Sequence, residues 1–264
     1  MNRLEKKLQG LRQTGEKAAV FFVTAGDPSL TETLAVMEAM ADAGADVIEL
    51  GVPFSDPIAD GPVIQRSTQR ALAQNVTLPA IFSLVEEFRR QRQTPLVLMG
   101  YYNPLLRYGL RRAMQDAARA GLDGVIIADL PYEEGEEAED AAQRAGLSLI
   151  YLLAPEIDPE RTRAILHASS GFVYCVSHYG TTGEKSGGGE LLPETVRMLK
   201  SMTDLPVLLG FGISSPDDVR EKAAVADGVI IGSWLIRTLE AAENRPQAAA
   251  EFVRAVKRAL KPGA

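Results

Sequence analysis

Short runs of Val, Ile and Leu alternate with longer amphipathic segments along the whole chain. The longer segments, such as Thr31–Ala43 and Glu133–Ala145, carry apolar residues at helical spacing. Because the short runs are almost continuously apolar, we expect parallel strands that are covered on both faces. They predict eight strands, at Ala19–Thr24, Asp46–Leu50, Leu96–Gly100, Gly124–Asp129, Leu147–Leu153, Gly171–Ser177, Pro206–Gly210 and Gly228–Gly232.

Eight strand–helix units in a chain of 264 residues predict a (β/α)8 TIM barrel. A doubly wound open sheet is the alternative, but it usually carries a GxGxxG turn after an early strand, and the sequence has none. No linker-like stretch divides the chain, so we expect a single domain over residues 1–264. An extra N-terminal helix, at about Arg3–Arg12, precedes the first strand and is expected to close the bottom of the barrel.

Composition and charge narrow the function classes. The net charge of −7 and the lack of a basic tract argue against binding to nucleic acid or to an anionic membrane. Anionic small ligands remain possible because backbone N–H groups can hold a phosphate. One cysteine, Cys175, and two histidines, His167 and His178, exclude an internal disulfide and a cysteine- or histidine-rich metal site. Without an apolar signal segment or membrane-length run, the chain is expected to be cytoplasmic.

Two connections are longer than packing requires. One is Gly51–Pro62 after the second strand, and the other is the glycine-rich segment Ser177–Leu191 after the sixth. Loops at this end of a barrel carry catalytic groups and lids, so we interpret both as active-site lids. Ordinary surface loops are the alternative. Asn103-Pro104, after the third strand, is expected to form a turn.

Glu49 is the strongest candidate for chemistry. Side chains alternate along a strand, so Glu49 and Val47 should point into the barrel, while Ile48 and Leu50 face the helices. A carboxyl group there would be desolvated, which raises its pKa toward neutrality and suits proton transfer. A structural ion pair is the alternative. Asp60, or less favourably Asp56, could supply a second carboxylate, although aspartates beside Pro and Gly commonly form turns.

A phosphate site is indicated by the last third of the chain. GFGISS at Gly210–Ser215 and Gly232-Ser233 follow the seventh and eighth strands, where barrels commonly bind phosphate. Thr182 and Gly183 of the sixth loop could complete the site. Tight turns are the alternative. Aromatic residues near strand ends could line a flat apolar pocket, although each alone is more often core: Phe22, Tyr102, Tyr174 and Phe211.

The string ELGVPFSDPIADGP at Glu49–Pro62 resembles the signature of the tryptophan synthase alpha chain family. The resemblance covers nearly the whole chain, in the family's order, through FVTAGDPS at Phe22–Ser29, MGYYNPLLRYG at Met99–Gly109, GFVYCVS at Gly171–Ser177, GFGISSP at Gly210–Pro216 and IGS at Ile231–Ser233. It implies a barrel that cleaves indole-3-glycerol phosphate to indole and glyceraldehyde 3-phosphate in a retro-aldol reaction without a metal.

The resemblance also implies roles for individual residues. Glu49 would protonate C3 of the indole and help to move the hydroxyl proton, and Asp60 would interact with the indole N–H. The expected substrate contacts are Phe22, Tyr102, Tyr174, Thr182 and Phe211, and the expected phosphate contacts are Gly183, Gly212, Gly232 and Ser233.

By the same resemblance, the partner is a beta chain that carries pyridoxal phosphate, in an α2β2 heterotetramer, and the alpha chain itself binds no cofactor. Two other interpretations stay open: a stand-alone lyase, and a catalytically silent barrel that only activates a beta chain. His178 and Thr181 depart from the usual S-R-x-G-V-T-G pattern, and Trp234 stands where a small residue is common. These departures put lid closure and the shape of the phosphate loop in question.

Overall fold

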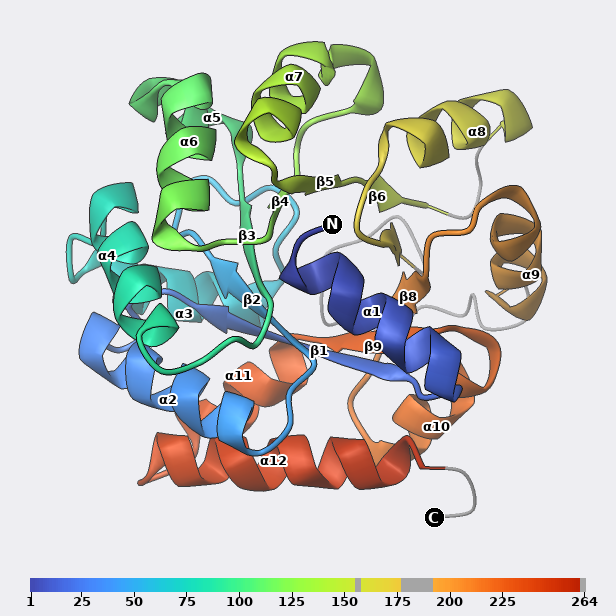
Figure 1. Ribbon diagram of the computed structural model, residues 1–264. Coiled ribbons are helices and arrows are strands. Elements are labelled where there is room, and N and C mark those ends of the chain that lie inside the picture. Colours follow the sequence, from blue (N-terminus) through green and yellow to red (C-terminus); the bar gives the residue numbers. More distant parts are fainter. Residues whose placement is uncertain (155–157, 177–191, 262–264) are drawn as a thin grey trace.

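The computed structural model describes residues 1–154, 158–176 and 192–261. Parallel strands form one nine-stranded sheet in the order β5-β4-β3-β2-β1-β9-β8-β7-β6. Figure 1 shows these strands around a central axis with helices outside them, which confirms the predicted TIM barrel. The strands are β1 (Ala18–Thr24), β2 (Val47–Gly51), β3 (Leu96–Gly100), β4 (Gly124–Ile127), β5 (Ser148–Ile150), β6 (Leu152–Leu153), β7 (Val173–Cys175), β8 (Val207–Leu209) and β9 (Gly228–Ile231).

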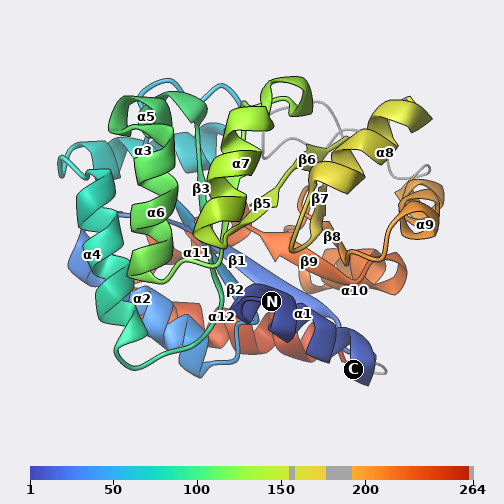
Figure 2. The same ribbon diagram turned by 45° about the horizontal axis from the view of Figure 1, so that its top comes forward.

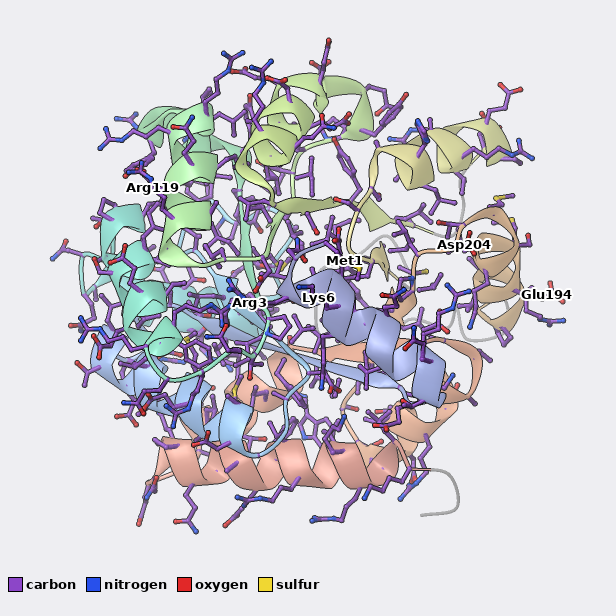
Figure 3. All side chains as sticks on the ribbon, viewed as in Figure 1. Met1, Arg3, Lys6, Arg119, Glu194 and Asp204 are labelled. Carbon is purple, nitrogen blue, oxygen red and sulfur yellow. The ribbon has the colours of Figure 1, made fainter. Side chains whose placement is uncertain are left out.

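Helices cover the outside of the barrel, and their charged side chains point away from it (Figure 3). None of the helices in the described ranges combines the length and apolar character needed to span a membrane. The helices are α2 (Leu30–Asp42), α3 (Pro62–Leu72), α4 (Leu78–Arg89), α5 (Tyr102–Tyr108), α6 (Leu110–Ala120), the 3-10 turn η1 (Tyr132–Glu134), α7 (Glu136–Ala145), α8 (Pro159–Ala168), α9 (Leu192–Met202), α10 (Pro216–Val225), α11 (Ser233–Glu240) and α12 (Arg245–Ala259).

The run predicted as one strand at Leu147–Leu153 forms two strands instead. β5 pairs with β4, and β6 pairs with β7, so one run of chain serves both neighbours in turn. Tyr151 lies between them, and its hydroxyl group donates a hydrogen bond of 2.8 Å to Glu139 on α7. The sequence therefore predicts one strand fewer than the structure describes. A hydrophobic run does not reveal the residue at which a strand stops pairing with one neighbour and starts pairing with the other.

Asn103 and Pro104 lie in α5, so the predicted turn at this place is wrong. Pro104 is the third residue of the helix. The first N–H groups of a helix have no intrahelical acceptor, so proline costs little there.

Side chains from the strands divide into an inner and an outer cluster, as the alternation predicts. Val47 packs inside the barrel with residues of β1, β3 and β4, while Ile48 and Leu50 pack beneath the surrounding helices. This arrangement directs the side chain between them, Glu49, toward the barrel axis.

The extra N-terminal helix, α1 (Arg3–Thr14), lies across one end of the barrel (Figures 1 and 2). Leu4, Leu8 and Leu11 enter the inner hydrophobic cluster, which confirms that α1 closes the bottom. Arg3 and Lys7 form salt bridges of 2.9 Å with the buried carboxylates of Asp123 and Asp46, respectively. Ligands therefore enter the barrel from its opposite end, where the strands have their carboxyl termini.

Candidate active site

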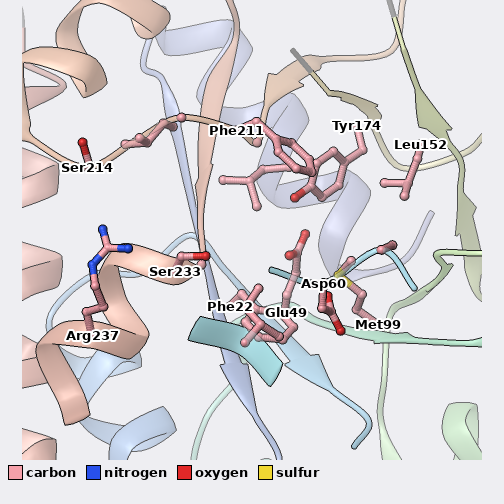
Figure 4. A pocket seen from close by; sticks show the side chains of 17 residues that line it. Phe22, Glu49, Asp60, Met99, Leu152, Tyr174, Phe211, Ser214, Ser233 and Arg237 are labelled. Carbon is pink, nitrogen blue, oxygen red and sulfur yellow. The ribbon is translucent and has the colours of Figure 1, made fainter. Parts of the chain in front are cut away.

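A cavity of about 310 Å³ opens at the carboxyl ends of the strands. Figure 4 shows Glu49 of β2 and Asp60 of the following loop near the ring of Tyr174 from β7. Phe22 of β1 and Phe211 also line this cavity. It therefore brings together both predicted carboxyl groups and three of the four predicted aromatic residues.

The Glu49 side chain is fully buried in this cavity, with 0% of its surface exposed. Neither carboxylate oxygen has a hydrogen-bond partner within the described residues. Desolvation raises the pKa of Glu49 to about 8 because nothing in its surroundings offsets the cost of the charged form. Glu49 is therefore mostly protonated at neutral pH. An unpartnered buried carboxyl group is costly, and it is the kind of group that a ligand can satisfy.

Asp60 reaches the cavity from the loop Gly51–Pro62, which is described in full. Burial raises the pKa of Asp60 to about 6, and a hydrogen bond from the Tyr101 hydroxyl group limits this rise. Asp60 is therefore mostly ionised at pH 7, in contrast to Glu49. Asp56, the other candidate in this loop, is exposed and accepts a hydrogen bond from the neighbouring Ser55. The two carboxyl groups of the cavity thus differ in protonation because their surroundings differ.

Tyr101 is a contact that the sequence analysis missed. It follows β3 directly, is only 4% exposed, and accepts a hydrogen bond of 3.1 Å from the Ala59 N–H. Its ring packs against Phe54 at 5.4 Å. Tyr101 thus touches the loop Gly51–Pro62 at three of its residues, Phe54, Ala59 and Asp60.

Tyr102, the predicted contact, does not line the cavity. It is the first residue of α5, and its backbone N–H donates a hydrogen bond of 2.7 Å to Asp129. The change from strand to helix at this point turns the two adjacent tyrosines in different directions. The GYYN string indicates a tyrosine at this corner, but alternation cannot show which of the two contacts the loop Gly51–Pro62 once the strand has ended.

Two glycines give the aromatic walls their shape. A Cβ atom on Gly51 would lie 2.4 Å from the ring of Phe22, and one on Gly210 would lie 2.2 Å from the ring of Tyr174. Both rings therefore occupy space that any other residue at these positions would take. Phe211 packs edge-on against Tyr174 at 6.5 Å. Burial, with the nearby charges of Glu49 and Asp60, raises the pKa of Tyr174.

The far end of the cavity is lined by the predicted phosphate residues Gly212, Gly232 and Ser233. Gly212 has a φ of +66°, which favours glycine. Gly232 precedes α11, whose first N–H groups have no acceptor within the helix. This end also includes Ser214 and Arg237, which the sequence analysis did not single out.

Several expectations lie outside the described residues. These are Thr182, Gly183, His178, Thr181 and the loop Ser177–Leu191 to which they belong. Trp234, by contrast, packs edge-on against Phe252 of α12 at 4.5 Å, so its ring extends behind the phosphate end and contributes to the core there.

The acidic, histidine and cysteine side chains of the described ranges form no group of three or more that could hold a metal ion. Cys175 is buried on the helix-facing side of β7, and burial raises the pKa of its thiol to about 12. The arrangement suits acid–base chemistry on a ligand with a flat apolar part and an anionic end.

Comparisons with known proteins agree with this arrangement. The family model for the tryptophan synthase alpha chain matches residues 8–263. The tryptophan synthase alpha chain of Geobacter sulfurreducens is 45% identical over 262 residues, which cover 98% of this chain and 99% of that protein. That of Geotalea daltonii is 48% identical over 240 residues, or 91% of each chain.

Among solved structures, tryptophan synthase subunit alpha from Legionella pneumophila superposes with a TM-score of 0.89 at 37% identity and covers 98% of both chains. A structure of Mycobacterium tuberculosis tryptophan synthase gives a TM-score of 0.91 at 35% identity over 99% of both chains.

Proposed function

The chain belongs to the tryptophan synthase alpha chain family, and on this premise we propose that the cavity around Glu49 is its active site. The family's reaction is the lyase cleavage of indole-3-glycerol phosphate into indole and glyceraldehyde 3-phosphate. One observation carries the proposal: Glu49 is fully buried, aimed into the cavity and without a partner for either oxygen in the described residues.

Glu49 is proposed as the acid and then the base of the cleavage. With its pKa at about 8 it carries a proton at neutral pH, which it delivers to C3 of the indole. The carboxylate that remains is desolvated, so it is a strong base for the proton of the glycerol hydroxyl group beside the ring. As this proton leaves, the aldehyde forms and the bond between the side chain and C3 breaks. Its electron pair returns to the ring and restores indole.

Asp60 is proposed as the stabilising charge. Protonation at C3 places positive charge on the ring nitrogen, and an ionised carboxylate beside the N–H stabilises it. The pKa of about 6 keeps Asp60 ionised under conditions in which Glu49 is still protonated. The same reaction thus uses two carboxyl groups in opposite protonation states.

The remaining contacts follow from the shape of the cavity. We place the indole ring against Phe22, Tyr174 and Phe211, and the phosphate at Gly212, Gly232 and Ser233. Thr182 and Gly183 stay predicted contacts, since they lie outside the described residues. Tyr102 stays a predicted substrate contact, and we propose that its neighbour Tyr101 acts through its hydrogen bond to Asp60.

A tryptophan synthase beta chain is the proposed partner, in an α2β2 heterotetramer. Pyridoxal phosphate is then expected in the beta chain and not in this one. The loop Gly51–Pro62 supports this proposal, because it carries Ile58 with 77% of its surface exposed at the open end of the barrel. The lid role of both long loops, the single domain over residues 1–264 and the cytoplasmic location stay predictions.

The test is indole release from indole-3-glycerol phosphate by the purified chain, alone and with a beta chain added. Slow cleavage that rises strongly with the beta chain is the expected result for an allosteric alpha subunit. Fast cleavage whose rate does not change when the beta chain is added would favour a stand-alone lyase. No cleavage in either case would refute the proposal and favour a silent barrel that only activates its partner.

A further inference from the structure

Arg237 is the one cationic side chain that lines the active-site cavity within the described ranges. It lies on α11, one helical turn after Ser233. In Figure 4 its guanidinium group points toward the space bordered by Ser214 and Ser233. The two carboxyl groups of the cavity, Glu49 and Asp60, lie at the opposite end of the same space. The cavity therefore has an acidic end and a basic end.

No carboxylate of the described residues pairs with Arg237. Its neighbour on α11, Glu240, is engaged by Arg66 at 3.3 Å and by Arg70 at 2.9 Å. Most other arginines of this chain lie within salt-bridge distance of an acid, as the pairs of Arg89 and Arg92 illustrate. An arginine without an acid at the mouth of a cavity is available for an anionic ligand, to which it can donate two parallel hydrogen bonds.

We infer that Arg237 recognises the phosphate group of the substrate and sets the preference of the site for phosphorylated ligands. The inference rests on the proposed function and adds a side-chain cation to a phosphate end made of glycines, Ser233 and a helix N-terminus. A chain with a net charge of −7 repels a phosphate dianion at long range, so a cation at the phosphate end of the cavity favours its binding.

The role of Arg237 is in binding, because the phosphate lies away from the bond that breaks and keeps its charge throughout the reaction. An interaction that is equally strong before and in the transition state lowers KM and leaves kcat unchanged. The Arg237 side chain is exposed, so water and salt weaken its pairing with phosphate. We expect an effect of about tenfold on KM, between that of an exposed ion pair and that of a charge-assisted hydrogen bond.

The experiment compares Arg237→Gln with Arg237→Lys and with a matched control, Arg254→Gln. Arg254 is exposed on α12 and does not line the cavity. Each protein is assayed on indole-3-glycerol phosphate and on the same compound without its phosphate. The expected result is a KM about tenfold higher for Arg237→Gln on the phosphorylated substrate only. Its kcat should stay within about twofold of the wild type, and Arg237→Lys should recover part of the affinity.

Three results would overturn the inference. They are an unchanged KM in Arg237→Gln, an equal loss on both substrates, or an equal loss in the Arg254→Gln control. If the wild type cleaves neither substrate, the proposed function fails, but the inference is still tested by inorganic phosphate and glycerol 3-phosphate. Each should raise the Tm of the wild type and raise that of Arg237→Gln by clearly less, and equal shifts would refute the role of Arg237.

Discussion

Replacing Glu49 by Gln is expected to make the protein inactive and more stable. The substitution keeps the shape of the side chain and removes its ability to ionise. Burial raises the pKa of Glu49 from 4.5 to about 8. In the unfolded chain the carboxyl group is free to lose its proton at its ordinary pKa. The wild-type protein therefore pays a free-energy cost for folding at neutral pH that the Gln variant avoids.

The size of this effect follows from the two pKa values. Well below pH 4.5 Glu49 is protonated in both the folded and the unfolded protein, so its ionisation has no effect on stability. As pH rises, the unfolded state releases the proton while the folded state keeps it, so stability falls until the pH passes the folded pKa. The loss amounts to about 3 kcal/mol at pH 7 and about 5 kcal/mol above pH 8, at about 1.4 kcal/mol for each pH unit.

Urea unfolding of wild type and Glu49→Gln at pH 5, 7 and 8.5 measures the difference directly. The gain in the free energy of unfolding should be small at pH 5 and should grow toward pH 8.5. Asp56→Asn is a matched control, because Asp56 is an exposed acid of the neighbouring loop. It should shift stability by less than about 0.5 kcal/mol at all three pH values.

Activity measured on the same samples should fall by about 10²- to 10⁴-fold in Glu49→Gln, the scale of a lost proton-transfer group. A stability difference that does not change with pH would show that the pKa of Glu49 is not raised. Turnover within about tenfold of the wild type would refute its role as acid and base.

Four further outcomes are expected. Wild-type kcat/KM should be highest between about pH 6 and about pH 8. Asp60→Asn should remove the acid limb of this profile and lower activity about 10²- to 10⁴-fold, and a change below about threefold would move the role elsewhere. Tyr101→Phe removes a hydrogen bond that lowers the pKa of Asp60, so the acid limb of the profile should move up by about one pH unit. An acid limb at an unchanged pH would contradict the role of Tyr101 in setting the pKa of Asp60. Gly210→Ala should push the Tyr174 ring into the cavity and so raise KM, and it should lower the free energy of urea unfolding by about 1–3 kcal/mol. An unchanged KM would show that the ring moves in another direction.

The sequence predicts the barrel and its two carboxyl groups because both depend on regular patterns. Alternation along Val47–Gly51 places Glu49 inside with no knowledge of other strands. Asp60 follows from its place in a long loop at the carboxyl end of the same strand. The strand pattern also predicts that burial raises the pKa of Glu49, and the structure agrees in direction. The absence of a partner for Glu49 in the described residues could not be predicted in this way, because it depends on what every neighbouring strand contributes.

Predictions fail where one kind of structure changes into another. Tyr101 and Tyr102 lie at the junction of β3 and α5, where the alternation of the strand no longer applies. Asn103-Pro104 reads as a turn because proline at the start of a helix has the same local signature as proline in a turn. Arg237 was missed because helical position alone does not show which turn of α11 reaches the cavity.

The helix that closes the barrel also bears on how the chain assembles. α1 is the first helix of the sequence, yet the Asn2 side chain beside it donates hydrogen bonds to the Asp123 carbonyl group and the Ser148 hydroxyl group, 121 and 146 residues further along. These partners exist only when β4 and β5 are in place. α1 can therefore complete these contacts only after more than half of the barrel has formed, at the entropic cost of closing very long loops. Until then, Leu4, Leu8 and Leu11 lack the part of their inner cluster that β4 and β5 supply, and this apolar face is a point at which the incompletely folded chain is open to association with other molecules.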